Sequence, residues 1–413
     1  MADTLVVFSI VAGIIAVGFL ANLLFKKTGF PNSLFLILVG VIIGPVFMLF
    51  SPVDVDPVTP FLTSLTLMMI LFEGGLNMDI HKVISQSFRA AILAALYVTS
   101  ATAFVTLFSH FLLGLQWLEA LMLGPMTAGT SSVVIIPLVS KLKVSKEVEV
   151  TLSLESTITD VLNIVLVLVI LQTYVGGLVN IQQTIVTVVS KFAIGAVVGA
   201  IIGILWIRIL YLERREEYTY ILTLGVLIGA YTVSETLGGS GPLTALLFGL
   251  MLGNDKEIFT ALKIKLDLDY LSEIKAFLKR TQGELAFLIR AFFFVFLGLI
   301  YGVGGGNFPI WEGIIIAIVI VSVNLIFRYS AATIATWKSD MFEYRRFVTF
   351  MCGIGLANAT LSILLYRQLS EAYPLDPHVV YAASLYPTII TNIIIITNVV
   401  TSIAPFLVKS SRK

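Results

Sequence analysis

Long apolar stretches separated by short charged segments dominate the chain. A window of about 19 residues, the length of a helix that crosses a bilayer, detects such stretches throughout the sequence. There are thirteen of them, at 4–25, 33–50, 58–76, 90–115, 117–138, 150–175, 184–207, 218–237, 241–252, 284–303, 310–337, 347–369 and 379–407. The span 241–252 is short and depends on its flanks. The pattern predicts an all-α polytopic membrane protein with thirteen transmembrane helices.

Composition supports a lipid environment. The 413 residues are 58% hydrophobic and 12% charged, whereas about 25% of the residues of a soluble domain are charged. The single cysteine excludes a disulfide framework and a cysteine-ligated metal cluster. The net charge of +1 gives no indication of a nucleic-acid partner, and none is expected. No phosphate-binding glycine loop is present, which argues against an ATP-driven pump, and we expect no cofactor.

The loop charges predict an orientation. Of the 26 Lys and Arg residues, 22 lie in alternate loops on one side, three lie within spans, and Arg367 alone lies opposite. The positive-inside rule therefore predicts an outside N-terminus and a cytoplasmic C-terminus. The first span lacks a basic leader and a cleavage site, so we expect a retained helix. The chain ends shortly after its last span, so no appended cytoplasmic regulatory domain is expected.

The loop 256–280 alternates charged and apolar residues. This pattern predicts an amphipathic helix along the cytoplasmic membrane surface, with a solvated linker as the alternative. The rest of the chain contains no low-complexity tract or soluble domain, so residues 1–413 are interpreted as a single membrane domain.

Two spans contain features that interrupt a helix. In 117–138, Gly124-Pro125 precedes a run of small polar residues, and 347–369 contains a similar run rich in glycine. Interrupted spans at corresponding places in two halves are typical of inverted-repeat transporters, whose half-helix ends bind ions. The alternative is that small residues only allow close helix packing. The candidate residues in these two segments are Gly129, Thr130, Ser131, Asn358 and Thr360.

Asp160 is a carboxylate within the apolar run 150–175. A bare charge at membrane depth costs several kcal/mol, so it must be neutralised by a proton, a cation or a partner charge. Ser156, Thr159, Asp160 and Asn163 occupy positions i, i+3, i+4 and i+7, which places their oxygens on one helical face. Their oxygens, with carbonyls of the interrupted span 117–138, could replace the hydration shell of a small monovalent cation.

Other charges at membrane depth also need partners. Arg328 and Arg290 both lie well inside apolar runs, and guanidinium stays charged. We expect one of them to form a structural ion pair with Glu155, so that Asp160 is left to bind the ion. Glu73, near the cytoplasmic end of its span, is either a second acid of the site or an interfacial charge.

Three motifs together resemble a known family. They are Leu-Phe-Glu-Gly-Gly-Leu at 71–76, the block from Glu155 to Asp160, and Arg-Ala-Phe-Phe-Phe at 290–294 followed by Gly298. With thirteen spans, the chain is similar over essentially its whole length to the NhaP-type branch of the monovalent cation/proton antiporters. The resemblance implies a homodimer in the cell membrane, with dimerisation helices and a mobile six-helix core containing two crossed, unwound helices.

The resemblance also implies roles for individual residues. Asp160 matches the essential aspartate that binds the ion and the proton, and Ser156 matches a neighbouring ligand. Glu73 matches a glutamate of the third helix. Glu155 and Arg328 match a structural ion pair, with Arg290 as the competing partner.

The chain departs from the family pattern at two places. It has Thr159-Asp160 where the family usually has Asn-Asp, and Thr130-Ser131-Ser132 where the family has Thr-Asp-Pro. A single titratable aspartate supports one proton per cation and hence electroneutral exchange. The missing carboxylate weakens the case for sodium, and a less charged site would suit potassium.

The predicted function is secondary active exchange of a monovalent cation for H⁺, with Na⁺ preferred and Li⁺ also accepted. A K⁺/H⁺ antiporter and a non-transporting ion sensor are the alternatives, and an ion channel is a weaker one. The chain is not predicted to be an enzyme, because the intramembrane-protease motifs His-Glu-x-x-His and Gly-x-Gly-Asp are absent.

Overall fold

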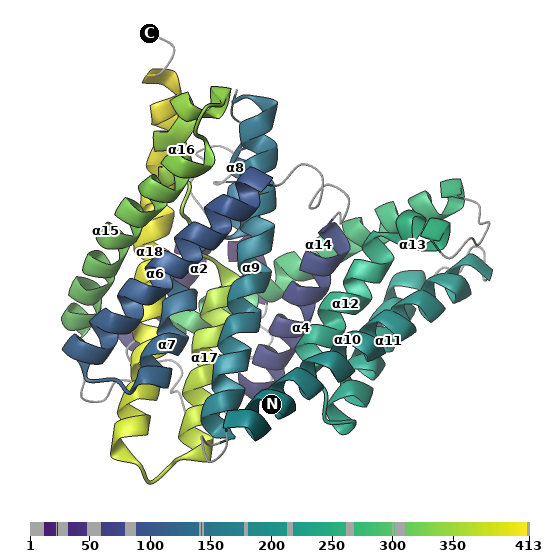
Figure 1. Cartoon of the computed structure of the whole chain (residues 1–413), viewed down its shortest axis with the longest axis horizontal. Helices are drawn as coiled ribbons and strands as arrows, with labels where there is room; N and C mark the ends of the chain where they lie inside the picture. Colours follow the sequence, from purple (N-terminus) through teal and green to yellow (C-terminus); the bar gives the residue numbers. More distant parts are fainter. Residues whose placement is uncertain are drawn as a thin grey trace. The chain divides into compact units, whose positions relative to one another are not determined.

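The chain is helical throughout the part that the structure describes. This computed structural model describes residues 12–21, 23, 32–47, 59–78, 88–139, 142, 144–176, 181–212, 218–261, 268–299, 301 and 310–410. These ranges contain helices and no strand (Figure 1). The predicted all-α fold is confirmed.

Six of the described helices are long and apolar enough to cross a membrane. They are Phe88–Leu113, Lys146–Val175, Val189–Tyr211, Lys275–Leu299, Trp311–Ala335 and Pro377–Phe406. Helix occurs in every one of the thirteen predicted spans, but several of these helices are short or divided. The count of thirteen transmembrane helices therefore stays a prediction.

The chain divides into two compact units. The first consists of Met1–Thr63, Ser87–Leu171 and Arg290–Lys413. Its helices are α2 (Asn32–Val41), η1 (Ile42–Val46), α6 (Phe88–Leu113), α7 (Trp117–Thr127), α8 (Ser132–Val139), α9 (Lys146–Val175), α15 (Ile310–Ala335), η3 (Asp340–Tyr344), α16 (Arg345–Phe350), α17 (Leu356–Ala372) and α18 (Pro377–Ser410). Helix α6 packs against α7 and α15, and α18 packs against α15, α16 and α17.

The second unit consists of Ser64–Gln86 and Gln172–Ile289. Its helices are α4 (Thr59–Asn77), α10 (Ile181–Leu212), α11 (Thr219–Thr236), α12 (Gly241–Gly253), α13 (Asp255–Ala261) and α14 (Leu268–Leu299), of which α14 ends in the first unit. Helices α4 and α12 approach closely at glycines: a Cβ on Gly249 would lie 2.4 Å from the carbonyl oxygen of Phe72. A larger residue there would push the two backbones apart.

The predicted amphipathic segment 256–280 does not form one separate helix. Helix α13 ends at Ala261, and α14 begins at Leu268 and continues without interruption to Leu299. The predicted surface segment and the predicted span 284–303 thus share one helix as far as Leu299. Residues 262–267 lie outside the described part of the chain.

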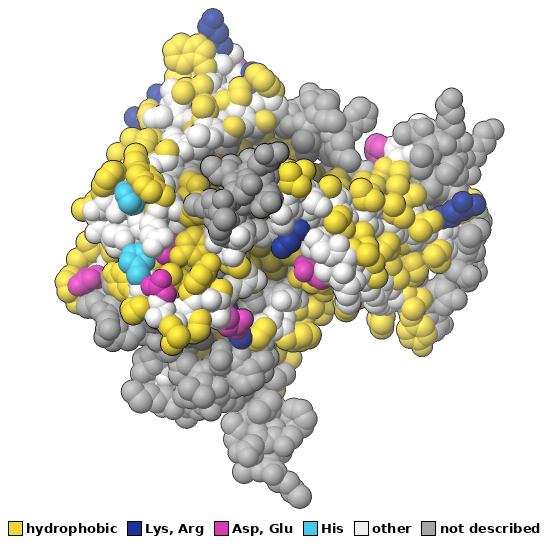
Figure 2. All heavy atoms as spheres, turned by 60° about the horizontal axis from the view of Figure 1, so that its bottom comes forward, with side chains coloured by type: hydrophobic (Ala, Val, Ile, Leu, Met, Phe, Trp, Pro, Cys, Tyr) yellow, Lys and Arg dark blue, Asp and Glu magenta, His cyan; other side chains and the backbone are white. Residues whose placement is uncertain are grey.

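The described surface of the molecule is rich in apolar side chains. Figure 2 shows hydrophobic groups spread over the visible face, with few charged groups between them. Phe88 and Phe111, both on α6, are 79% and 73% exposed. An exposed apolar surface of this extent is typical of a protein whose surroundings are lipid.

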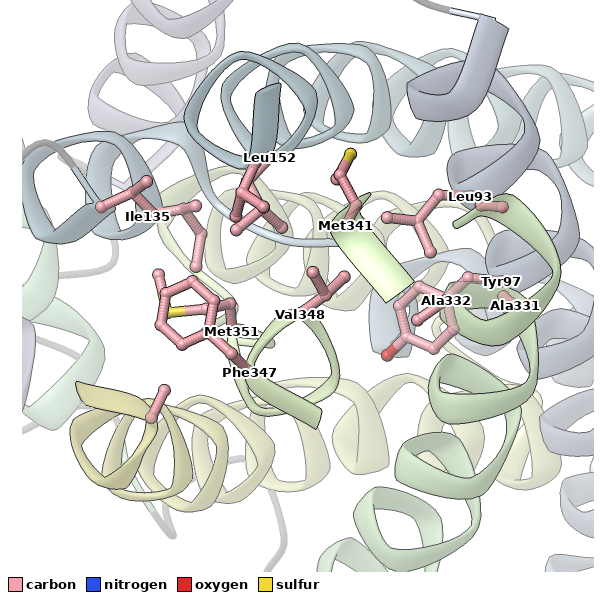
Figure 3. Packing of buried hydrophobic residues seen from close by; sticks show 14 of the residues in the cluster. Leu93, Tyr97, Ile135, Leu152, Ala331, Ala332, Met341, Phe347, Val348 and Met351 are labelled. Atoms are coloured by element: carbon pink, nitrogen blue, oxygen red, sulfur yellow. The ribbon is translucent and has the colours of Figure 1, made fainter. Parts of the chain in front are cut away.

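A buried apolar cluster of the first unit surrounds the ends of its short helices. Leu93 and Tyr97 of α6, Ile135 of α8 and Leu152 of α9 pack together with Phe347 of α16 (Figure 3). The interior of a protein is close-packed, so this cluster holds the short helices α8 and α16 against α6 and α9.

Candidate functional site

The predicted span 117–138 is interrupted at its centre. Helix α7 contains Pro125 and ends at Thr127, and α8 begins at Ser132. Proline removes a backbone hydrogen bond from the helix. Gly129 then adopts φ +98°, a conformation that favours glycine, and a Cβ on it would lie 2.5 Å from Nδ2 of Asn163. We call residues 128–131 the first break.

The predicted span 347–369 is interrupted in the same way. Helix α16 ends at Phe350 and α17 begins at Leu356. Residues 351–355, the second break, have no regular secondary structure. Gly353 and Gly355 of the second break allow other chain segments to approach its backbone closely.

The two breaks cross and touch each other. The N–H of Ser131 donates to the carbonyl oxygen of Gly353 at 2.8 Å. A Cβ on Gly355 would lie 2.2 Å from Oγ of Ser131, so the crossing leaves no room for a side chain there. The crossed arrangement of two unwound helices, which the resemblance implied, is present.

The backbone groups that the first break exposes are satisfied mainly by side chains of α9. The N–H of Thr130 donates to Oγ1 of Thr159 at 3.2 Å, and the same hydroxyl lies 3.2 Å from the carbonyl oxygen of Thr130. Nδ2 of Asn163 donates to the carbonyl oxygen of Ala128. From α15, Nδ2 of Asn324 donates to the carbonyl oxygen of Thr127 at 2.9 Å. Buried backbone groups need such partners, so these bonds hold the break open.

Three backbone groups of the second break are satisfied by neutral side chains of α18. The N–H groups of Cys352 and Ile354 donate to the hydroxyls of Thr401 and Thr397, each at 3.2 Å. Nδ2 of Asn398 donates to the carbonyl oxygen of Ile354 at 3.0 Å. All three α18 side chains are buried.

Glu155 and Arg328 form a fully buried ion pair beside both breaks. Nη1 and Nη2 of Arg328 lie 3.0 and 3.2 Å from Oε1 and Oε2 of Glu155, a bidentate arrangement. The hydroxyl of Thr130 donates to Glu155 at 2.9 Å, and Arg328 also donates to the carbonyl oxygen of Met351 at 2.8 Å. The pair therefore joins the first break to the second.

The carboxylate of Asp160, a residue of α9, lies beside the N-terminus of α8. Its Oδ2 accepts a hydrogen bond from the N–H of Ser132 at 3.0 Å and another from the hydroxyl of Ser132 at 2.8 Å. The N-terminus of a helix carries partial positive charge and favours an anion. Asp160 is partly buried, whereas Glu155 is completely buried. Since Arg328 neutralises Glu155, these three residues together carry one net negative charge.

The predicted face of α9 lies against the first break. Thr159, Asp160 and Asn163 all contact residues 128–132. Ser156 is buried, and its hydroxyl donates to the carbonyl oxygen of Ser153 at 3.1 Å, within its own helix. The structure thus brings three of the four residues of this face onto the break through hydrogen bonds.

The remaining predicted residues are on other helices. Glu73 is on α4 in the second unit. Arg290 is on α14, and it is the first residue of that helix that belongs to the first unit. On α17, the hydroxyl of Thr360 donates to Leu356 of its own helix at 2.8 Å. The side-chain oxygen of Asn358 is buried and has no hydrogen-bond partner among the described residues.

Sequence reasoning missed several residues that hold this arrangement. Ser132 is one of several small polar residues of its span, and Asn324 is a single amide within an apolar run, so neither is distinguished in the sequence. Thr397, Asn398 and Thr401 of α18 are neutral. The only sign of their role in the sequence is that they are polar residues within the apolar run 379–407.

A model of a known protein family matches nearly the whole chain. The family is described as "Sodium/hydrogen exchanger, transmembrane", and the match covers residues 12–409. The solved structure of the sodium proton antiporter MjNhaP1 from Methanocaldococcus jannaschii at pH 8 superposes with a TM-score of 0.79, covering 98% of both chains at 21% identity. This similarity shows that the two proteins share a fold.

Two kinds of named relative are similar in sequence. A protein of Methanocaldococcus jannaschii named "Probable Na(+)/H(+) antiporter 2" is 24% identical over 400 residues, which cover 94% of this chain and 90% of the relative. The K(+)/H(+) antiporter NhaP2 of Shewanella sp. (strain ANA-3) is 28% identical over 266 residues, which cover 61% of this chain and 45% of the relative. The matched region is therefore less than half of the NhaP2 protein.

Proposed function

Because this chain belongs to the sodium/hydrogen exchanger family, we propose that it exchanges a monovalent cation for a proton across a membrane, with both ions binding in competition at Asp160. The family match confirms the predicted membership in the monovalent cation/proton antiporters of NhaP type. It also makes the chain a multi-pass membrane protein, in agreement with its long apolar helices.

The observation that carries the proposal is the charge balance at the crossing. Arg328 is engaged with Glu155 in a buried bidentate pair, and Asp160 adds one negative charge beside it. One proton or one monovalent cation is enough to neutralise that charge. A carboxylate that can bind either a proton or a monovalent cation meets the chemical requirement for exchange.

The same charge explains why the two ions must alternate. Moving a bare carboxylate through an apolar environment is costly. The unit that contains Asp160 therefore moves readily, and opens the site to the other side of the membrane, when the carboxylate carries either ion. It moves poorly when the carboxylate carries neither ion. Binding of one ion on one side is then coupled to release of the other. One proton per cation makes the exchange electroneutral.

The proposed cation is Na⁺, with Li⁺ also accepted, and K⁺ is the alternative. The relative that matches over the greater length is named for Na⁺, whereas the NhaP2 relatives are named for K⁺. Oxygen atoms of Thr130, Ser131 and Thr159 are the proposed ligands beside Asp160, and they suit either hard cation. Glu73 stays a proposed second acid of the site, and Ser156 a proposed ligand.

The cellular arrangement is also proposed from the family. We expect a homodimer in the cell membrane, with the N-terminus outside and the C-terminus in the cytoplasm. A non-transporting ion sensor with the same cation site is the second candidate function, since the site would bind ions whether or not the protein moves them.

The test is proton movement in proteoliposomes that contain a pH-sensitive dye. NaCl, LiCl or KCl is added in turn to vesicles with the wild-type protein, with Asp160→Asn, or with Glu371→Gln as a control for the loss of an exposed carboxylate. We expect a cation-driven pH change in the wild type and the control, and none in Asp160→Asn. Cation binding without any pH change would favour the sensor, and full exchange in Asp160→Asn would contradict the proposed site.

A further inference from the structure

Ser132 makes two hydrogen bonds to one oxygen of the proposed ion-binding carboxylate. Its N–H and its hydroxyl lie 3.0 and 2.8 Å from Oδ2 of Asp160. Ser132 is the first residue of α8, so its N–H points out of the helix and is not used within it. Both donors are therefore directed at the same carboxylate oxygen.

Hydrogen bonds to an ionised carboxylate are stronger than those between neutral groups. The two bonds from Ser132 stabilise Asp160 when it is charged and holds no cation. A cation that binds Oδ2 must share this oxygen with the two donors or displace one of them. The bonds thus favour the ion-free site over the occupied one.

We infer that Ser132 is a positioning residue that lowers the affinity of the site for its cation, and so sets the concentration range in which the protein works. This inference rests on the proposed exchange at Asp160 and adds the residue that tunes it. The site then binds its cation weakly enough to release it in each cycle.

Three substitutions separate the two donors. Ser132→Ala removes the hydroxyl and keeps the N–H. Ser132→Pro removes both donors, and proline is well tolerated at the first position of a helix. Ser132→Thr keeps both donors. Ser362→Ala is the matched control, because Ser362 is also buried and its hydroxyl donates to the carbonyl oxygen of Ala359 in α17 at 2.7 Å.

The measurement is the apparent KM and the maximal rate of cation-driven proton movement in proteoliposomes at one pH. We expect KM to fall about tenfold in Ser132→Ala and further in Ser132→Pro, given the usual strength of hydrogen bonds to charged groups. Ser132→Thr and Ser362→Ala should leave KM unchanged. A lower maximal rate with unchanged or higher KM in both Ser132→Ala and Ser132→Pro would overturn the inference, because a purely structural role has that effect.

A second readout keeps this inference distinct from the proposed function. Added NaCl, LiCl or KCl should raise the melting temperature of the purified protein, and half of the effect should require less salt in Ser132→Pro than in the wild type. If the wild type shows this stabilisation but no exchange, the proposed function fails and the role of Ser132 is still tested. If the wild type exchanges ions and Ser132→Pro matches it in both readouts, only the role of Ser132 is contradicted.

Discussion

The two breaks each interrupt a helix, but they are held by different chemistry. At the first break, α9 supplies Asp160, Glu155, Thr159 and Asn163, so two of the four side chains are carboxylates. At the second break, α18 supplies only hydroxyl and amide groups. Arg328 contacts the second break at Met351 and reaches the first break through Glu155, which accepts a hydrogen bond from Thr130. The comparison supports the proposal that the first break carries the ion site and that the second break is its neutral support.

The largest effect is expected where the two breaks are joined. Arg328→Met leaves Glu155 buried without its partner and removes the donor to Met351, whereas Glu155→Gln keeps a hydrogen-bonding group. Breaking a buried ion pair costs about 3–5 kcal/mol, so Arg328→Met should lower the melting temperature strongly or prevent folding.

Thermal unfolding of the purified variants tests this expectation. The double variant Glu155→Gln/Arg328→Met should be more stable than Arg328→Met alone, since no uncompensated charge is left. Equal melting temperatures for Arg328→Met and the wild type would show that the pair does not join the breaks.

The crossing itself can be broken and repaired. In Gly355→Ala the new Cβ collides with Oγ and Cβ of Ser131, at 2.2 and 2.6 Å. Exchange should fall to a small fraction of the wild-type rate, because the two breaks must separate. Ser131→Gly removes both colliding atoms, so the double variant should regain much of the loss. A double variant no better than Gly355→Ala would mean that Ser131 and Gly355 are not packed against each other.

Equivalent amides at the two breaks should respond differently. Asn163→Leu and Asn398→Leu each remove a buried donor to a break carbonyl. Leaving a buried carbonyl unsatisfied costs about 1–3 kcal/mol, so both variants should be less stable to heat. Only Asn163→Leu should also change the KM for the cation, since Asn163 lies on the face that contains Asp160. A KM change of the same size in Asn398→Leu would remove the distinction between the breaks.

The smallest effect is expected at the hydroxyls of α18. Thr397→Val and Thr401→Val each remove the acceptor of one N–H of the second break. The loss of stability should be about 1 kcal/mol, near the net value of one hydrogen bond. The KM should not change, and melting temperature together with the transport assay checks both points. Loss of transport in a stable Thr401→Val protein would assign a direct role in ion binding to the second break.

The sequence predicted the parts of this arrangement that have a high energetic cost. Asp160 was identified because a charge in an apolar run is expensive, and both breaks were identified from clusters of glycine and small polar residues. Helical spacing was enough to place Thr159 and Asn163 on the same face as Asp160. These signals are local, so they can be seen without knowing which helices are neighbours.

Features that depend on long-range contacts could not be predicted. Arg290 and Arg328 are equally plausible partners for Glu155 in sequence, and only the packing of α15 against the breaks selects Arg328. Ser132 lies 28 residues from Asp160 in the chain, and a serine carries no signal of its own. A threonine or an asparagine has a small free-energy cost in an apolar helix, so the sequence gives no sign that those of α18 have a role. Their role is visible only where the two breaks cross.

The most direct test of the central claim is the dependence of KM on pH. If one cation and one proton compete for Asp160, then lowering the pH by one unit in the range where Asp160 is mostly protonated should raise the apparent KM about tenfold by mass action. The maximal rate, measured in proteoliposomes with saturating cation, should stay the same. A constant KM with a falling maximal rate would show that the proton acts at another site, and it would contradict competition at Asp160.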